Sequence, residues 1–331
     1  MLLNPIRFEP YLRPMVWGGR RLEEVLGKRL PTAEPYGESW EISDHASHPS
    51  KAVGGALAGR TLHDLMQREP AALLGASPPR SMFPWLVKFL DAQDWLSVQV
   101  HPDDESAPRL CPGEGGKTEA WFVLDAAPTA KVYAGLLPGV DEKRLRAALS
   151  AGTVADCLHS FRPRPGDCLF LPAGTVHAVG GGVLMAEVQQ TSDATFRLFD
   201  WNRRDDQGQS RTLHIEQAME CINWKAGPVQ PVHAEGYPQG SDAAPSPKPV
   251  RQPLVACRYF TLDYIRQREA FGCGGGKMQV LVVAHGRGTL SGQAGSCELR
   301  PGDTVLLPAG VAPQECWPEG DSLGVLRASL P

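Results

Sequence analysis

Four side chains between residues 99 and 177 have the chemistry of a metal-binding site. Gln99 and His101 lie in LSVQVHPDD, which reads as a strand, and because side chains alternate along a strand both face the same side. Glu119 follows in GKTEAWFVL and His177 in LPAGTVHAV. Two imidazoles, a carboxylate and an amide oxygen form a ligand set that suits Zn²⁺ or another divalent first-row ion. A lone histidine on a strand is more often an ordinary core or surface residue, so the fold must bring all four together.

The composition is that of a soluble protein rich in turns. The chain has 331 residues, 42% of them hydrophobic, and its 35 glycines and 30 prolines favour short strands joined by turns. The formal net charge of −4 offers no electrostatic reason to expect nucleic acid or a membrane surface as a partner. The eight cysteines include no C-x-x-C pair, so neither a disulfide framework nor a zinc ribbon is expected. The sequence shows neither a signal peptide nor a membrane-spanning apolar segment, so we expect a cytoplasmic protein.

Hydrophobic patterning predicts mainly β structure with a few short helices. Apolar spacing predicts a helix over 61–75 that ends at Gly75, and 139–161 reads as one or two short helices. The segment 226–253 is rich in Pro, Gly and Ala and is interpreted as a linker. Strands are predicted at 85–90, 95–101, 119–125, 131–136, 168–172, 183–190 and 195–201, and again within 277–286, 288–292 and 297–310.

A short internal repeat suggests that the chain contains two similar β units. RPGDCLFLPAGTVHAV begins at Arg164, and RPGDTVLLPAGVAPQE begins at Arg300. Both copies run from a turn through a buried strand to a Pro-x-Gly turn. His177 of the first copy aligns with Pro313 of the second, and proline cannot bind a metal ion. We therefore expect the second unit to be structural.

The first copy resembles a signature of the cupin superfamily, in which a small antiparallel barrel holds a metal ion. GDCLFLPAGTVH matches the second cupin signature, and Gln99-x-His101 stands where the first signature has His-x-His. Glu119 follows after an intervening loop. The resemblance implies that Gln99, His101, Glu119 and His177 face inward and bind one metal ion per chain, Zn²⁺ or another divalent first-row metal.

The expected architecture is two cupin-like jelly-roll barrels with a few short helices. Residues 1–225 would form the metal-binding catalytic unit, including N-terminal strands and short helices. Residues 226–253 would form the linker. Residues 254–331 would form a degenerate cupin-like unit without a metal site.

Longer blocks of sequence are similar to the short bacterial form of the type I mannose-6-phosphate isomerase family. They are WGGRRL, GESWEIS, LVKFLDAQDWLSVQVHPDDE, GKTEAWFVL, FLPAGTVHAVGGG and AEVQQTSDATFRLFDWNR, within the first 224 residues. The resemblance implies a zinc enzyme that interconverts mannose 6-phosphate and fructose 6-phosphate through a cis-enediol. Longer members carry a helical insertion for which the connection between Lys131 and Arg164 leaves no room, so we expect a more open pocket.

The resemblance and the residue types together suggest three catalytic residues. Arg197 aligns with an arginine of the family's active site and is expected to stabilise the enediolate. Glu187 lies in a buried apolar run, where a carboxylate is costly unless paired or functional. It is the first candidate for the base or a proton relay, and the alternative is a partner that orients a ligand histidine. Lys117 is expected at the same rim, where it would bind phosphate or assist ring opening.

Further residues are candidates for substrate binding. Ser97 faces the same side as Gln99, and Lys88 is a lysine within an apolar strand. Ser97 would bind phosphate or assist ring opening, and Lys88 is expected to face inward, because a lysine in so apolar a strand needs a reason. Trp17 and Trp40 are expected to form walls of the pocket, although tryptophans in β barrels are more often core residues.

Three other functions remain open at this point. Two histidines and one carboxylate also suit Fe(II) and dioxygen chemistry. A non-enzymatic sugar-binding protein could retain the fold, and an isomerase of another sugar would need similar residues. The expected partner is a small-molecule sugar phosphate, with the protein a monomer or homodimer.

Overall fold

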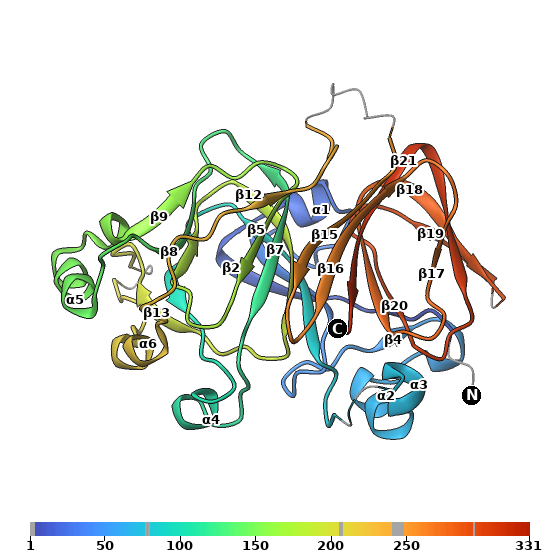
Figure 1. The fold of residues 1–331 in the computed structure, drawn as a ribbon, viewed down its shortest axis with the longest axis horizontal. Helices are drawn as coiled ribbons and strands as arrows, with labels where there is room; N and C mark the ends of the chain where they lie inside the picture. Colours follow the sequence, from blue (N-terminus) through green and yellow to red (C-terminus); the bar gives the residue numbers. More distant parts are fainter. Residues whose placement is uncertain (1–3, 77, 79, 205–207, 240–247, 294) are drawn as a thin grey trace.

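The computed structural model describes residues 4–331 except 77, 79, 205–207, 240–247 and 294. Two β units lie side by side, one built from the earlier part of the chain and one from the later part (Figure 1). Strands dominate and the helices are short, which confirms the predicted mainly β class. None of the helices in the described residues is long and apolar enough to cross a membrane.

The first unit consists of two antiparallel sheets that face each other. The larger sheet has the order β14-β10-β7-β12-β5-β3-β2, and the smaller has the order β13-β6-β11-β8-β9. The strands of the larger sheet are β2 (Tyr11–Gly19), β3 (Tyr36–Ile42), β5 (Trp85–Ala92), β7 (Glu119–Ala126), β10 (Asp167–Leu171), β12 (Val183–Gln190) and β14 (Val232–His233). Those of the smaller sheet are β6 (Val98–Val100), β8 (Val132–Leu136), β9 (Leu158–Phe161), β11 (His177–Val179) and β13 (Phe196–Phe199).

The larger sheet is buried on both faces, which explains why its central strands are almost continuously apolar. Side chains alternate along β7, so Trp121 packs inside the first barrel while Phe122 packs toward the second unit. The same alternation along β5 and β12 places Lys88 and Glu187 on the inner face, directly opposite each other. The sheet therefore carries the polar residues of the pocket on one face and the junction between the units on the other.

The second unit is an antiparallel sheet folded around its own apolar interior. Its strands are β15 (Val250–Ala256), β16 (Thr261–Gln267), β17 (Phe271–Cys273), β18 (Gln279–Gly292), β19 (Gly295–Leu299), β20 (Thr304–Leu307) and β21 (Gln314–Ser329). The order is β15-β16-β21-β18-β19, with β17 paired to β21 and β20 to β18. Leu281, Val305 and Val325 lie inside this barrel and are fully buried.

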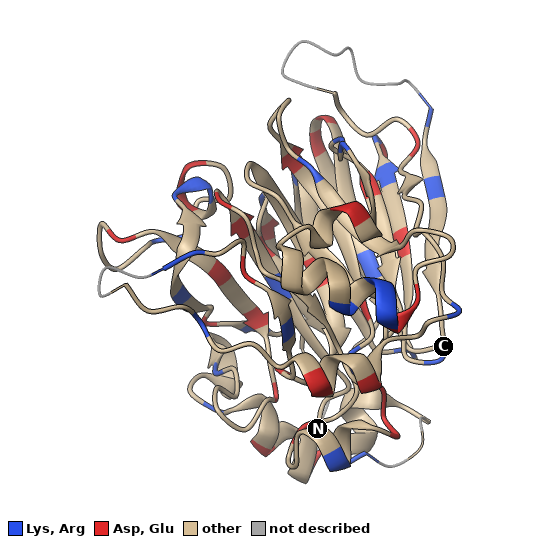
Figure 2. Ribbon diagram, turned by 90° about the vertical axis from the view of Figure 1, so that its left-hand side faces the viewer, with Lys and Arg blue, Asp and Glu red and all other residues tan. Residues whose placement is uncertain are grey.

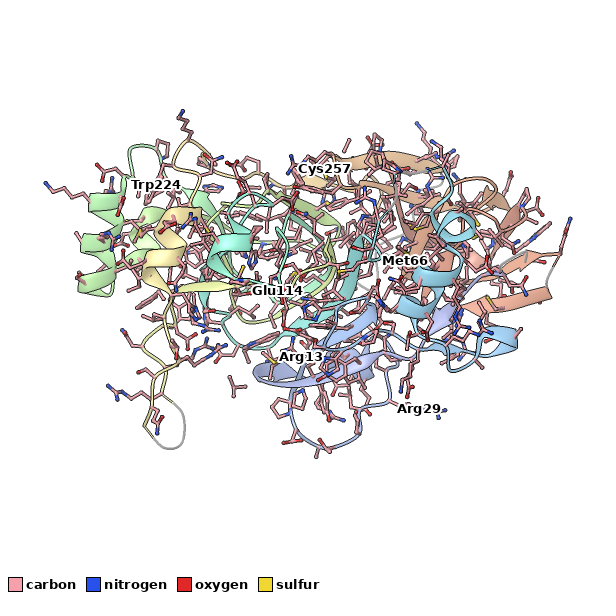
Figure 3. The ribbon with its side chains drawn as sticks, turned by 90° about the horizontal axis from the view of Figure 1, so that it is seen from below. Arg13, Arg29, Met66, Glu114, Trp224 and Cys257 are labelled. Atoms are coloured by element: carbon pink, nitrogen blue, oxygen red, sulfur yellow. The ribbon has the colours of Figure 1, made fainter. Side chains whose placement is uncertain are left out.

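The N-terminal part of the chain connects the two units. β1 (Arg7–Phe8) pairs with β4 (Ala52–Val53), and Ile6 exchanges backbone hydrogen bonds with Leu306 of the second unit. Helices α2 and α3 lie beside the second unit in Figures 1 and 3. The helices of this part are α1 (Arg21–Glu24), η1 (Gly55–Leu57), α2 (Leu62–Arg68) and α3 (Pro70–Leu74).

The remaining helices belong to the first unit. They are α4 (Ala107–Leu110), α5 (Glu142–Ala151), η2 (Val154–Cys157) and α6 (Ile215–Cys221). α5 and α6 cover the outer face of the smaller sheet. An ion pair of 2.8 Å joins Arg146 on α5 to Glu216 on α6. Figure 2 shows acidic and basic residues interspersed along the ribbon.

Three predicted elements differ in detail from the structure. The single helix predicted over 61–75 is two helices, because Pro70 cannot continue the hydrogen bonding of α2 and instead begins α3. Within 139–161, where only helices were predicted, β9 pairs with β8. The predicted linker contains β14, which pairs with β10, and the start of β15. The domain boundaries remain predictions.

Candidate metal centre and active-site pocket

His101, Glu119 and His177 converge inside the first barrel. Their ligand atoms all lie within 4.8 Å of one another, and all three side chains are buried. Glu119 Oε2 is 3.5 Å from His101 Nε2, and Glu119 Oε1 is 3.3 Å from His177 Nε2. This cluster can hold a metal ion.

The cluster forms because the two sheets of the barrel face each other. His177, the first residue of β11, is the direct cross-strand partner of Gln99 on β6. His101 follows the last residue of β6, and all three belong to the smaller sheet. Glu119 begins β7 in the larger sheet. Glu119 therefore faces the other three residues across the barrel interior.

The free polar atoms of the cluster fit a metal ion. Backbone carbonyls bond the Nδ1 atoms of both imidazoles: Ala194 O lies 2.8 Å from His101 Nδ1, and Thr175 O lies 2.9 Å from His177 Nδ1. Both Nε2 atoms and Glu119 Oε1 are buried without a hydrogen-bond partner among the described residues. Buried polar atoms without partners are rare in native proteins, and a bound cation would satisfy all three.

The protonation states also favour a cation. Burial, reinforced by the positive charge of Lys117, lowers the pKa of His101 to about 3. Burial lowers the pKa of His177 as well. Burial opposes ionisation of Glu119, but His101 and Lys117 outweigh it and hold the pKa of that carboxyl well below its usual range. Neutral imidazoles and an ionised carboxylate are the forms that bind divalent metals.

A pocket of about 210 Å³ opens beside this cluster and gathers the other predicted site residues. Gln99 and Glu119 line it directly. The remaining predicted residues in its lining are Trp17, Lys88, Ser97, Lys117, Glu187 and Arg197. The metal cluster and this pocket thus bring together every residue that the sequence proposed for the site except Trp40, which does not line the pocket, although their individual roles remain proposals.

Lys88 and Glu187 are a buried lysine and a buried carboxyl that lie opposite each other in the pocket wall. Each is only 3% exposed, and they face each other across β5 and β12. The Lys88 ammonium lies 5.1 Å from the ring centroid of Trp40, a distance that allows a cation–π contact. Trp40 itself is not part of the pocket lining. Burial, reinforced by Glu119 and opposed by Lys88, raises the pKa of Glu187 to about 8. Its Oε1 atom has no described hydrogen-bond partner.

Arg197 is held by neutral groups. Its Nε donates to Ser97 Oγ at 3.3 Å, and its Nη1 donates to the carbonyl of Thr212 at 2.8 Å. It forms no ion pair with a carboxylate of the described residues, so its positive charge is available to the pocket. Burial and the neighbouring Arg211 lower the pKa of Arg197.

The sequence interpretation missed several residues of the lining. Arg13 lies 3.0 Å from Glu38 and 3.5 Å from Asp193, and these three side chains line one part of the pocket. Burial opposes ionisation of Asp193, but Lys88, Lys117 and Arg13 outweigh it and lower its pKa. Arg211, Thr195 and Trp121 also line the pocket. A usable signal existed for Glu38, because it lies two residues before Trp40 in GESWEIS, and residues two apart on a strand share a face.

Known proteins with similar sequences and folds share one description. The family described as "Phosphomannose isomerase type I, catalytic domain" matches residues 6–122. The mannose-6-phosphate isomerase of Streptococcus mutans is 35% identical over 313 residues, 93% of each chain. The mannose-6-phosphate isomerase ManA of Bacillus subtilis is 32% identical over 94% of this chain and 95% of its own.

The fold agrees with the sequence comparison. The crystal structure of the mannose 6-phosphate isomerase from Bacillus subtilis superimposes with a TM-score of 0.85 and 29% identity, covering 98% of this chain and 99% of that one. This likeness confirms the predicted cupin-type fold, and the comparable lengths agree with the predicted short form. The chain belongs to the type I phosphomannose isomerase family.

Proposed function

We propose that this protein interconverts mannose 6-phosphate and fructose 6-phosphate. The observation that carries the proposal is the buried cluster of His101, Glu119 and His177, whose unpartnered atoms adjoin a pocket rich in cationic side chains. Membership of the phosphomannose isomerase family supports the substrate class. The reaction moves a proton between C1 and C2 of the open-chain sugar through a cis-enediol, so it needs charge stabilisation, a proton acceptor and a grip on phosphate.

The metal ion is proposed to be zinc, held by His101, Glu119, His177 and the amide oxygen of Gln99. Two imidazole nitrogens with carboxylate and amide oxygens form a donor set that Zn²⁺ accepts readily. When bound, the ion would supply Lewis-acid stabilisation of negative charge on a sugar oxygen. Arg197 would add a second positive charge, because it is the cross-strand partner of Gln99 and lines the same pocket.

Proton transfer is assigned to the carboxyl groups of the pocket. Glu187 is the first candidate, since it is buried, lines the pocket and has an oxygen without a described partner. Asp193 is the alternative, because it also lines the pocket and Arg13 lies 3.5 Å from it. Either carboxyl would exchange the proton with the substrate from the pocket wall.

The phosphate group requires cationic donors that remain open to solvent. Arg211 fits this role, because it lines the pocket and its side chain is 37% exposed. Lys88 and Lys117 are 3% and 5% exposed, so they suit the less hydrated sugar end, where ring opening takes place. A guanidinium at the mouth would bind the phosphate oxygens by charge-assisted hydrogen bonds.

The decisive experiment is a coupled assay for fructose 6-phosphate formed from mannose 6-phosphate. The metal-stripped protein would be assayed alone and after addition of Zn²⁺. Activity that requires the metal supports the proposal. A zinc-loaded protein without activity would contradict the substrate assignment, and free aldoses and then dioxygen-dependent reactions would be tested next on the same preparation.

A further inference from the structure

The loop between His101 and Glu119 carries a carboxylate that joins three separate segments. This carboxylate is Glu114, labelled in Figure 3, whose Oε1 atom forms a hydrogen bond of 2.9 Å with Nε2 of His45. Its Oε2 atom accepts from the backbone N–H of Asp193 at 2.9 Å and lies 3.1 Å from Ser192 Oγ. These contacts connect Glu114 with residues 43–50 on one side and with the turn 192–194 on the other.

The same turn orients a ligand of the metal centre. The carbonyl of Ala194, one residue after Asp193, accepts the hydrogen bond from His101 Nδ1. A hydrogen bond to one ring nitrogen fixes both the tautomer and the direction of the other nitrogen. The position of the Ala194 carbonyl therefore decides where His101 presents its free Nε2 atom.

His101 depends on this remote support in a way that His177 does not. The carbonyl that orients His177 belongs to Thr175, two residues earlier in the same turn. The carbonyl that orients His101 lies 93 residues away in the sequence. Only a tertiary contact can hold it in place.

We propose that Glu114 is a positioning residue for the metal centre. Its hydrogen bonds to Ser192 and Asp193 hold the turn 192–194 in place and so keep the Ala194 carbonyl against His101. Its loop is anchored beside the same ligand, because the N–H of Lys117 donates to the carbonyl of Pro102 at 2.9 Å. His45 is set to donate to Glu114, since its Nδ1 accepts from the N–H of Ser47 at 3.3 Å. An ionised carboxylate that accepts several hydrogen bonds makes a strong fastening.

The inference rests on the proposed function only in taking the cluster of His101, Glu119 and His177 to be a metal site. The inference also explains why a long loop separates two of the metal ligands, His101 and Glu119. This loop places Glu114 against the turn that supports His101. Glu114 itself does not line the pocket, so its effect on the reaction would pass through His101.

The test measures zinc affinity rather than activity. Metal-stripped Glu114→Ala and Glu114→Gln would be titrated with Zn²⁺ against a competing chelator, and Co²⁺ spectra would report the ligand geometry. Support lost around a metal ligand costs about 10- to 100-fold in affinity, and we expect a loss near the lower end with an altered Co²⁺ spectrum. Glu220→Gln is the matched control, because this exposed carboxylate also accepts a side-chain hydrogen bond, from Arg109, and contacts no ligand.

Unchanged zinc affinity in both Glu114 variants would overturn the inference, as would an equal loss in Glu220→Gln. If Glu114→Ala fails to fold, the near-isosteric Glu114→Gln decides the question, with thermal unfolding of the metal-free protein as the check on its fold. A wild-type protein that binds zinc without isomerase activity would contradict the proposed function and leave this test intact.

Discussion

The two barrels share a strand-and-turn pattern but fill their interiors differently. The first places Lys88, Glu119 and Glu187 inside, each at most 3% exposed, whereas the second packs apolar side chains such as Leu281 around two thiols, Cys273 and Cys316. The two sulfur atoms lie 3.7 Å apart. Burial of charged groups is costly unless they pair or bind an ion, so the first interior is organised around chemistry and the second around packing.

The aligned positions His177 and Pro313 show where the two barrels diverge. In the first, His177 reaches Glu119 of the opposing sheet. In the second, the residue after Pro313 is Gln314, whose side chain donates to the nearby carbonyl of Ala312 at 2.8 Å. Among the described residues of the second barrel, no three His, Cys, Asp or Glu side chains converge. The shared turn therefore supports the fold in both barrels and a metal-binding cluster in one.

The largest predicted effect is a loss of activity on replacing His177 but not on replacing Pro313. His177→Ala removes a proposed metal ligand, and the lost stabilisation of several kcal/mol should lower kcat/KM on the order of 10³-fold or more. Pro313→Ala should leave kcat/KM and zinc content unchanged. Zinc content and steady-state kinetics would be measured for both. Equal losses in the two variants would refute the assignment of the site to the first barrel.

A second prediction concerns charge inside the first barrel. Glu187→Gln keeps the shape of the side chain but prevents proton transfer, and should lower kcat by about 10²- to 10⁴-fold. The thermal unfolding temperature should change little, because the amide replaces a carboxyl that is costly to bury. Asp193→Asn is the comparison. A larger loss of kcat in Asp193→Asn than in Glu187→Gln would transfer the proton-transfer role to Asp193.

Truncation of a core side chain in the second barrel should lower stability and leave activity unchanged. Leu281 is fully buried, so Leu281→Ala should lower the free energy of unfolding by about 2–5 kcal/mol through lost burial and a cavity. The kcat of the folded protein should stay at the parent value. Denaturant unfolding and steady-state kinetics would be compared with Val232→Ala, a 44% exposed control. A lower kcat in folded Leu281→Ala would show that the second barrel contributes to the site.

The smallest predicted effect is a pH dependence of stability caused by His285, which lies on the side of the second unit that faces the first. Burial and the charge of Arg266 lower the pKa of His285 to about 4, and His285 Nε2 lies 2.8 Å from Tyr264 Oη. Because the pKa in the unfolded chain is about 6.5, the unfolded state takes up the proton first as the pH falls. The stability from neutral His285 is therefore present above pH about 6.5 and is lost toward pH 4.

Thermal unfolding of the parent and His285→Gln across this pH range would test that linkage. The stability of the parent minus that of the variant should decrease as the pH falls. Other groups titrate alike in both proteins, so their contributions cancel in this difference. A constant difference, or one that grows at low pH, would contradict the prediction.

The metal cluster was found from local spacing together with the resemblance to the cupin signatures, because most of its ligands fall in short motifs. Gln99 and His101 share a strand face, and His177 follows a Pro-x-Gly turn. Arg13, Glu38 and Asp193 were not predicted as site residues. They reach the pocket through β2, β3 and the turn before β13, and the order β7-β12-β5-β3-β2 that joins these strands cannot be read from chain order. Similarly, β9 exists because β8 provides its hydrogen-bond partner.

The amino-acid sequence by itself determined the mainly β class, the repeated turn and the ligand types, because alternation, proline and glycine act over a few residues. Only the tertiary structure decided which carbonyls orient the two histidines, which acids and arginines share the pocket, and how Glu114 reaches the turn beside His101. These relations join residues far apart in the chain, and they arise when two sheets close around one interior.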